Sequence, residues 1–91
     1  MLVRSRVPRV ELRAYRPPHV ATRLLTRRFC EEQAVMPVNV IGGSLIIAMA
    51  NPDDRSTIDE VALMTGLMIE VVAAMPDEIA DSIANCYGEA N

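Results

Sequence analysis

Few side chains in this chain of 91 residues could perform chemistry. There is one histidine, His19, and no acid or cysteine motif stands beside it. A serine or cysteine nucleophile activated by a base would depend entirely on this imidazole. The two cysteines, Cys30 and Cys86, lack the spacing of metal ligands. One disulfide could form between them in an oxidising compartment, but we expect two reduced packing residues of a cytoplasmic protein.

The acidic pairs Asp53-Asp54 and Asp59-Glu60 are the one group that suggests a site for a hard cation. Their spacing lacks the glycine and the closing glutamate of a calcium loop. Carboxylates at the start of a helix are explained by capping and by the helix dipole. The chain also has no lysine, so it cannot supply the cation of a G-x-x-x-x-G-K-[ST] phosphate loop. We therefore predict no catalytic residues, no metal and no cofactor: the chain is not an enzyme.

Charge is divided unevenly along the chain. Eight of the nine arginines precede Cys30, where Glu11 is the only acid, and the remainder is acidic, for a net charge of −3. One interpretation is a solvated basic tail and helix face; the other is a surface that steers an acidic partner or an anionic membrane. Nucleic-acid binding is disfavoured because most of the arginines lie in a segment broken by prolines, with only Tyr15 near them.

Three apolar runs predict a small sheet. Leu45–Ala50 lies between Gly42-Gly43 and Asn51-Pro52 and is too short for a buried helix, so it is expected to be a buried strand. The preceding run, Met36–Ile41, should pair with it as a tight hairpin across the two glycines. Pro37 belongs at the start of that strand or on an edge. The third strand is Met68–Ala74, where Glu70 marks an exposed or edge position.

Three helices are expected around this sheet. The first, Val20–Gln33, carries an apolar stripe, with Arg23, Arg27 and Arg28 on its other face and i,i+4 partners Glu31 and Glu32. The second spans Thr57–Thr65, with a capping box at Thr57–Glu60 and a stop at Gly66. The third begins at Pro76 and ends at Gly88.

The predicted order is α-β-β-α-β-α, which is an α+β fold: a two-layer sandwich of a small three-stranded sheet and flanking helices. Residues 1–18 are broken by Pro8 and by Pro17-Pro18 and are expected to form an arm or linker, with only Val10–Leu12 extended. Residues 19–91 form the domain. No apolar run approaches the length needed to span a membrane, so we expect no membrane insertion.

In its ordered set of motifs, the chain resembles the N-terminal domain of bacterial type II secretion and type IV pilus assembly ATPases, in particular its second subdomain. The motifs are Leu45–Asp54 (LIIAMANPDD), Ile58–Val61, Thr65-Gly66, Val71–Ala73, Ile83 and Tyr87-Gly88, with weaker similarity at Val10–Leu12 and Arg28–Val38. The resemblance covers about residues 10–88. Asn51 stands where the family pattern usually has aspartate.

This resemblance implies a protein-interaction domain that docks a secretion or pilus motor onto a cytoplasmic part of the inner-membrane platform protein. The partners would be the cytoplasmic domain of that platform protein and the motor domain of the parent ATPase, with room for a homo-oligomer. The chain would be cytoplasmic and would reach the inner membrane only through a partner. The partner-binding residues we assign are Arg23, Arg27 and Arg28.

The alternative is a regulatory module that senses a ligand or binds nucleic acid. Some relatives bind cyclic di-GMP through a repeated motif that begins Arg-Leu-Gly and ends in Gln. Here Arg23-Leu24 is followed by Leu25, and although Gln33 lies downstream, the spacing and a second copy are missing. The binding half of those relatives would precede the segment that this chain resembles.

Overall fold

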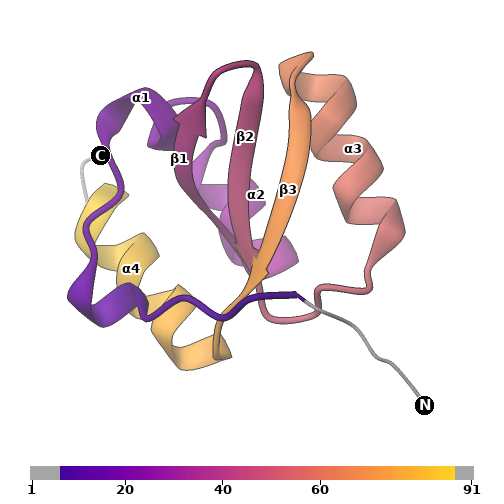
Figure 1. Cartoon of the computed structure of the whole chain (residues 1–91). Coiled ribbons are helices and arrows are strands. Elements are labelled where there is room, and N and C mark those ends of the chain that lie inside the picture. Colours follow the sequence, from indigo (N-terminus) through magenta and orange to yellow (C-terminus); the bar gives the residue numbers. More distant parts are fainter. Residues whose placement is uncertain (1–6, 88–91) are drawn as a thin grey trace.

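The computed structural model describes residues 7–87, and the structural statements below concern that part of the chain. The helices lie around one small mixed sheet (Figure 1), which confirms the predicted α+β class. The elements in chain order are the 3-10 helix η1 (Leu12–Ala14), α1 (His19–Thr22), α2 (Arg27–Gln33), β1 (Val35–Ile41), β2 (Ser44–Met49), α3 (Arg55–Thr65), β3 (Met68–Ala73) and α4 (Pro76–Tyr87).

The sheet has the order β1-β2-β3, with β1 antiparallel and β3 parallel to the central strand. Ile41 pairs with Ser44, so Gly42 and Gly43 form the predicted two-residue turn, and Gly42 adopts a φ of 61°. A parallel neighbour requires a long crossover, which α3 provides. Pro37 and Glu70 lie on the two outer strands, as their chemistry predicted.

The central strand β2 supplies the middle of the hydrophobic core. Leu45 and Ile47 are fully buried and Met49 is 1% exposed. These three side chains alternate along the strand and therefore share one face of the sheet. The core cluster also contains buried residues from the other elements and from the rest of the sheet: Leu12, Ala21, Leu25, Cys30, Val35, Met36, Val38, Ala48, Val61, Ala74, Ile79 and Ile83.

The start of α3 differs from the prediction. Its N-cap is Asp54, whose carboxylate accepts hydrogen bonds from the Thr57 backbone N–H (3.2 Å) and the Thr57 hydroxyl (2.8 Å). The capping box predicted at Thr57–Glu60 is therefore wrong, because Thr57 already lies in the first helical turn. A hydroxyl can accept the same N–H bond, but the negative charge of a carboxylate is in addition stabilised by the positive end of the helix dipole. Gly66 ends the helix with a φ of 71°, as predicted.

Residues 7–18 belong to the segment that was expected to form an arm or linker. They pack on their own chain: the Val10 N–H donates to the Ala73 carbonyl (3.0 Å), the Ala73 N–H donates to the Pro8 carbonyl (2.7 Å), and Leu12 is buried. Proline lacks an N–H but keeps its carbonyl, so Pro8 can still accept a bond from the outer edge of β3. A domain boundary at residue 18 remains a prediction.

The C-terminal helix α4 begins at Pro76, as predicted, and buries Ile79 and Ile83. It packs against β1 and β2 and also against η1 and α2. Its predicted end at Gly88 lies outside the described residues. No helix within residues 7–87 is long and apolar enough to cross a membrane.

Replacing Ile47 with alanine tests this arrangement. We expect a loss of about 2–5 kcal/mol in the free energy of unfolding, because the side chain is fully buried and its removal leaves a cavity in the central strand. Urea denaturation followed by circular dichroism measures the change. Leu63→Ala is the matched control, since Leu63 is 86% exposed on α3 and its truncation should cost less than about 0.5 kcal/mol. Equal losses for both variants would refute the assignment of the core.

Candidate docking surface

The three arginines assigned as partner-binding residues do not lie on one helix. The predicted helix Val20–Gln33 is divided into α1 and α2, and Arg23 is the C-cap of α1. Thr26 adopts an extended conformation and caps α2 by accepting a hydrogen bond from the Phe29 N–H (3.1 Å). The single long helix is therefore wrong: a threonine that caps a helix start competes with continuation of the helix. We call residues 19–33 the basic corner.

Tyr87, at the end of α4, holds this corner in place. Its hydroxyl lies 2.7 Å from the Thr22 carbonyl and 2.9 Å from the Leu25 carbonyl, and its single hydrogen is shared between them. Both carbonyls lie at the break between α1 and α2, where helical partners are missing. The Cys30 thiol lies 3.6 Å from the hydroxyl oxygen and can donate to it. The hydroxyl therefore ties three segments together.

Burial keeps both of these groups neutral. It raises the pKa of the Cys30 thiol to about 11, although the hydrogen bond to Tyr87 lowers it. It also raises the pKa of Tyr87 above the ordinary value for tyrosine, with the bond to Cys30 as a smaller cause. A thiol whose anion is disfavoured is a poor nucleophile. Cys30 and Cys86 are both free thiols, and Cys30 is buried.

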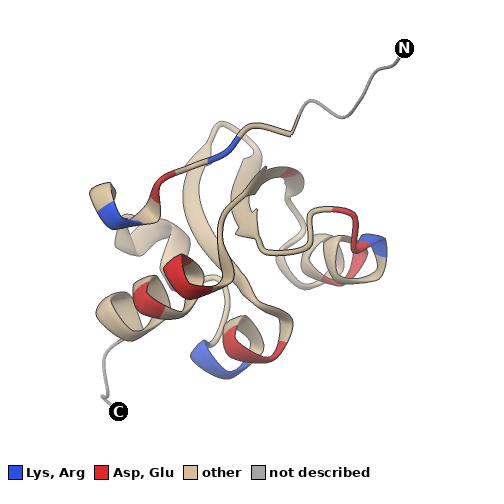
Figure 2. Ribbon diagram, turned by 90° about the horizontal axis from the view of Figure 1, so that it is seen from below, with Lys and Arg blue, Asp and Glu red and all other residues tan. Residues whose placement is uncertain are grey.

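The arginines of the basic corner differ in how far their charge is balanced. Arg23 is exposed. Arg28 has a side chain that is 86% exposed and pairs with Glu32 at 3.1 Å, while Arg27 pairs with Glu31 at 2.8 Å. These are the two predicted i,i+4 pairs, and Figure 2 shows the basic and acidic segments of α2 adjoining. The local field is therefore weaker than three arginines alone would produce.

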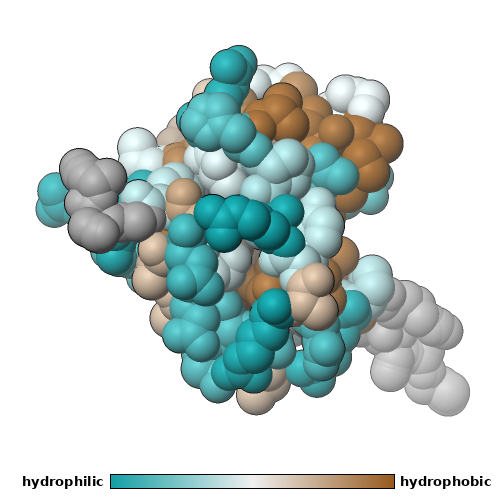
Figure 3. Space-filling view, turned by 90° about the vertical axis from the view of Figure 1, so that its left-hand side faces the viewer, coloured by the Kyte–Doolittle hydropathy of each residue, from teal (hydrophilic) through white to brown (hydrophobic). Residues whose placement is uncertain are grey.

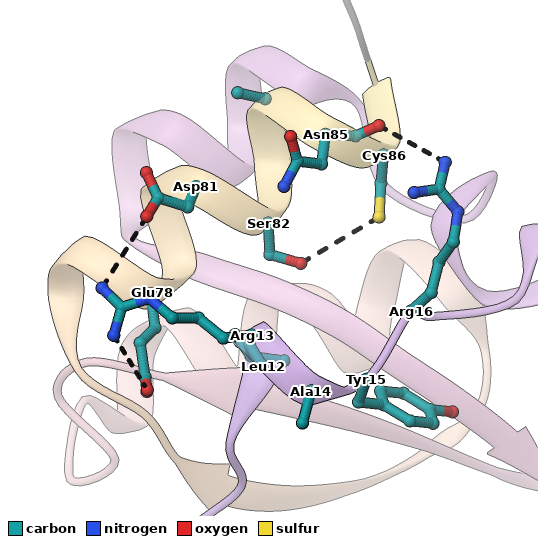
Figure 4. Close-up of a pocket in the computed structure, with 11 residues that line it drawn as sticks. Leu12, Arg13, Ala14, Tyr15, Arg16, Glu78, Asp81, Ser82, Asn85 and Cys86 are labelled. Carbon is teal, nitrogen blue, oxygen red and sulfur yellow. Dashed lines mark hydrogen bonds and ion pairs between the residues drawn. The ribbon is translucent and has the colours of Figure 1, made fainter.

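A concave surface lies between η1 and α4 and encloses about 590 Å³ (Figure 4). Arg13 projects across it toward three carboxylates of α4, at 3.2 Å from Asp77, 3.9 Å from Glu78 and 3.8 Å from Asp81. Arg16 reaches the Asn85 carbonyl at 3.4 Å. The arginines of this groove thus hold residues 12–16 against α4 and are engaged within the chain.

This groove was not predicted, because residues 1–18 were expected to form an arm or linker. The available signal was a pair of acids one turn apart, Asp77 and Asp81, whose charge complements an arginine far upstream, Arg13. Such a long-range match is not unique in a chain with nine arginines. Within residues 7–87, no three of the His, Cys, Asp and Glu side chains come together in a way that could hold a metal ion.

Comparisons with known proteins agree on one domain type. The family model described as the MshEN domain matches residues 5–91. The type IV pilus assembly ATPase PilB of Myxococcus xanthus (strain DK1622) is 32% identical over 83 residues, which are 91% of this chain and 15% of PilB. The chain thus spans a small part of that relative.

Solved structures show the same domain. Two crystal forms of the XpsE N-terminal domain superpose with TM-scores of 0.75 and 0.80, at 32% and 33% identity, over 85% and 90% of this chain and 55% and 58% of theirs. A structure of MshE with cdg has a TM-score of 0.81 at 21% identity, over 89% of this chain and 59% of that one, and at this identity it supports the fold alone.

Removing the Tyr87 hydroxyl tests its role in the basic corner. Tyr87→Phe should lower the free energy of unfolding by about 1–3 kcal/mol, because two carbonyls at the helix break lose their donor. Thermal and urea denaturation measure this loss, and amide exchange of residues 22–26 reports local loosening. Tyr15→Phe is the control: Tyr15 is 37% exposed, and its hydroxyl donates one bond, to the Val38 carbonyl at 3.1 Å. An effect no larger than that of the control would contradict the role given to Tyr87.

Proposed function

The chain belongs to the MshEN domain family, whose members include N-terminal domains of type II secretion and type IV pilus ATPases, and from this premise we propose that it is a non-catalytic docking domain. It attaches a secretion or pilus motor to a cytoplasmic part of the inner-membrane platform protein. Binding occurs at the basic corner, with Arg23, Arg27 and Arg28 as the contact residues. The domain acts in the cytoplasm and reaches the membrane through its partner.

The observation that carries this proposal is that the corner is both exposed and held in one shape. Leu25 is only 3% exposed and anchors the corner in the core, while Tyr87 binds the backbone on either side of Arg23. A surface that is already ordered loses little conformational entropy on binding. The exposed guanidinium groups of Arg23 and Arg28 project from this ordered backbone. Guanidinium forks match carboxylates in bidentate geometry, so the complementary partner surface is acidic.

The charges act mainly on the encounter with the partner. Arg27 and Arg28 already have glutamate neighbours, so a new carboxylate competes with an existing pair. Exposed pairs contribute little to affinity, whereas charge at the rim of an interface changes the association rate and its dependence on salt. We therefore expect the basic corner to steer and orient the partner more than to bind it tightly.

Neutralising the corner tests this proposal. The triple variant Arg23→Gln, Arg27→Gln, Arg28→Gln should lower the association rate constant for the cytoplasmic domain of the cognate platform protein by about tenfold at low salt and flatten its salt dependence. Glutamine avoids new repulsion with Glu31 and Glu32. Surface plasmon resonance over a series of salt concentrations measures both effects. Arg55→Gln, on the exposed start of α3, is the control. A triple variant that associates like this control would exclude the corner from the interface.

A second candidate is sensing of a cyclic dinucleotide, which one observation favours: a protein of the same fold, MshE, was solved with cdg (cyclic di-GMP). The structure of this chain argues against the corner as that site. The motif of such relatives places glycine where Leu25 stands, and Leu25 is a core side chain whose carbonyl accepts the Tyr87 hydroxyl. A ligand approaching the backbone there would meet a buried leucine and not an open glycine.

Titration calorimetry with cyclic di-GMP separates the two candidates. For this chain we expect no saturable heat and no chemical-shift change at residues 22–26, because Leu25 replaces the glycine of the motif and a second copy of the motif is missing. The XpsE N-terminal domain and MshE serve as comparison proteins under the same conditions. Saturable binding with shifts at the basic corner would establish ligand sensing in place of docking.

A further inference from the structure

One face of the sheet is open at its hairpin end. Because side chains alternate along strands, Ile41, Ser44 and Met68 form one row across β1, β2 and β3, and Asn39, Ile46 and Glu70 form the next. We call these six residues the open face. Ile41 is 60% exposed and Met68 is 73% exposed. Figure 3 shows hydrophobic residues gathered at the upper right of the molecule, toward the end at which the hairpin lies in Figure 1.

The exposure is unusual for these strands. Parallel pairs such as β2 and β3 are normally covered on both faces. On the opposite face of the central strand, Leu45 and Ile47 are fully buried, whereas Ile46 on the open face is only half-buried. Large apolar side chains that are exposed together on the face of a sheet mark a place where another molecule packs. Within residues 7–87, nothing covers Ile41 or Met68.

We propose that the open face binds the open face of a second copy of this chain, about a two-fold axis that runs along β2. This symmetry places β1 of one copy over β3 of the other. Ile41 then faces the second copy's Met68, and each β2 residue faces its own counterpart. Two sheets stacked in this way pack in the aligned manner of a β-sandwich. The interface is isologous, so a single patch must complement itself.

The polar residues of the open face complement each other under this symmetry. The same symmetry places Asn39 over the second copy's Glu70. The Asn39 side-chain oxygen accepts the Val40 N–H at 2.8 Å, which leaves its two amide hydrogens for another acceptor. Glu70 is an exposed carboxylate, and in the described part of the chain no ion pair involves it. Each dimer therefore gains two amide-to-carboxylate hydrogen bonds, related by the axis.

Sedimentation velocity of the 91-residue chain over a range of concentrations gives the first test. We expect a monomer–dimer equilibrium that Met68→Glu weakens by at least about tenfold, because a charge would be buried against Ile41. Leu63→Glu is the matched control, since Leu63 is even more exposed but lies on the outer side of α3. A strictly monomeric wild-type chain, or equal effects of both variants, would overturn the proposal and leave the open face to a different protein.

Exchanging the polar residues Asn39 and Glu70 tests how the two copies are aligned. Asn39→Asp should weaken the dimer, because two carboxylates would then face each other, and addition of Glu70→Asn in the same chain should restore it. Restored dimerisation of the double variant would support this symmetry. A double variant that folds but does not dimerise would overturn it. The readout does not depend on any platform protein, so the proposed docking function can fail or succeed separately.

Cross-linking locates the axis. Ser44 faces its own counterpart across this axis, and packed sheets are about 10 Å apart, which is too far for a disulfide but suits a short bismaleimide. In a Cys86→Ser background, Ser44→Cys should cross-link to dimers faster than Ser56→Cys, an exposed position on α3. Equal rates for the two positions would contradict an axis along β2.

Discussion

The need to bury β2 is the constraint on which the rest of this structure depends. Its Leu45-Ile46-Ile47-Ala48-Met49 run has no polar side chain, and every backbone group in it needs a partner. An antiparallel β1 and a parallel β3 supply those partners, and the parallel neighbour in turn requires a crossover, which α3 provides. The remaining helices then bury the Leu45, Ile47 and Met49 face. Topology follows here from the hydrogen-bonding needs of one strand and the apolar area of one face.

The hairpin turn, the end of α3 and the start of α4 could be predicted, because each is determined by residues next to it in the sequence. The two glycines between apolar runs, the glycine after α3 and the proline that opens α4 each act within a few residues of themselves. Two of the features that were missed also involve distant residues. The break in the first helix, which the Thr26 cap creates, is bound by Tyr87, about 60 residues away, and residues 7–18 are held by Ala73 and by the acids of α4. No periodicity in either segment reports such partners.

The candidate site also combines features that could be predicted with features that could not. The i,i+4 pairs of Arg27 and Arg28 were predictable because both members lie on one helical turn. The placement of Arg23 at a helix end was not, since it follows from the competition between helix continuation and the Thr26 cap. This competition changes what the corner can do. In one long helix the three arginines would have formed a continuous charged stripe, whereas the break separates Arg23 from a pair whose charge is already balanced.

The two proposed surfaces differ in their physics, and the structure keeps them apart. The basic corner is polar, exposed and held by Tyr87, which suits contacts that form and break under the control of charge. The open face combines three apolar side chains with a hydroxyl, an amide and a carboxylate, which suits an interface held by buried area and a few matched hydrogen bonds. The corner packs on β1 through α1, while the open face includes the hairpin tip and β3. A domain that docks through the first surface can therefore still pair through the second, because neither set of residues belongs to the other.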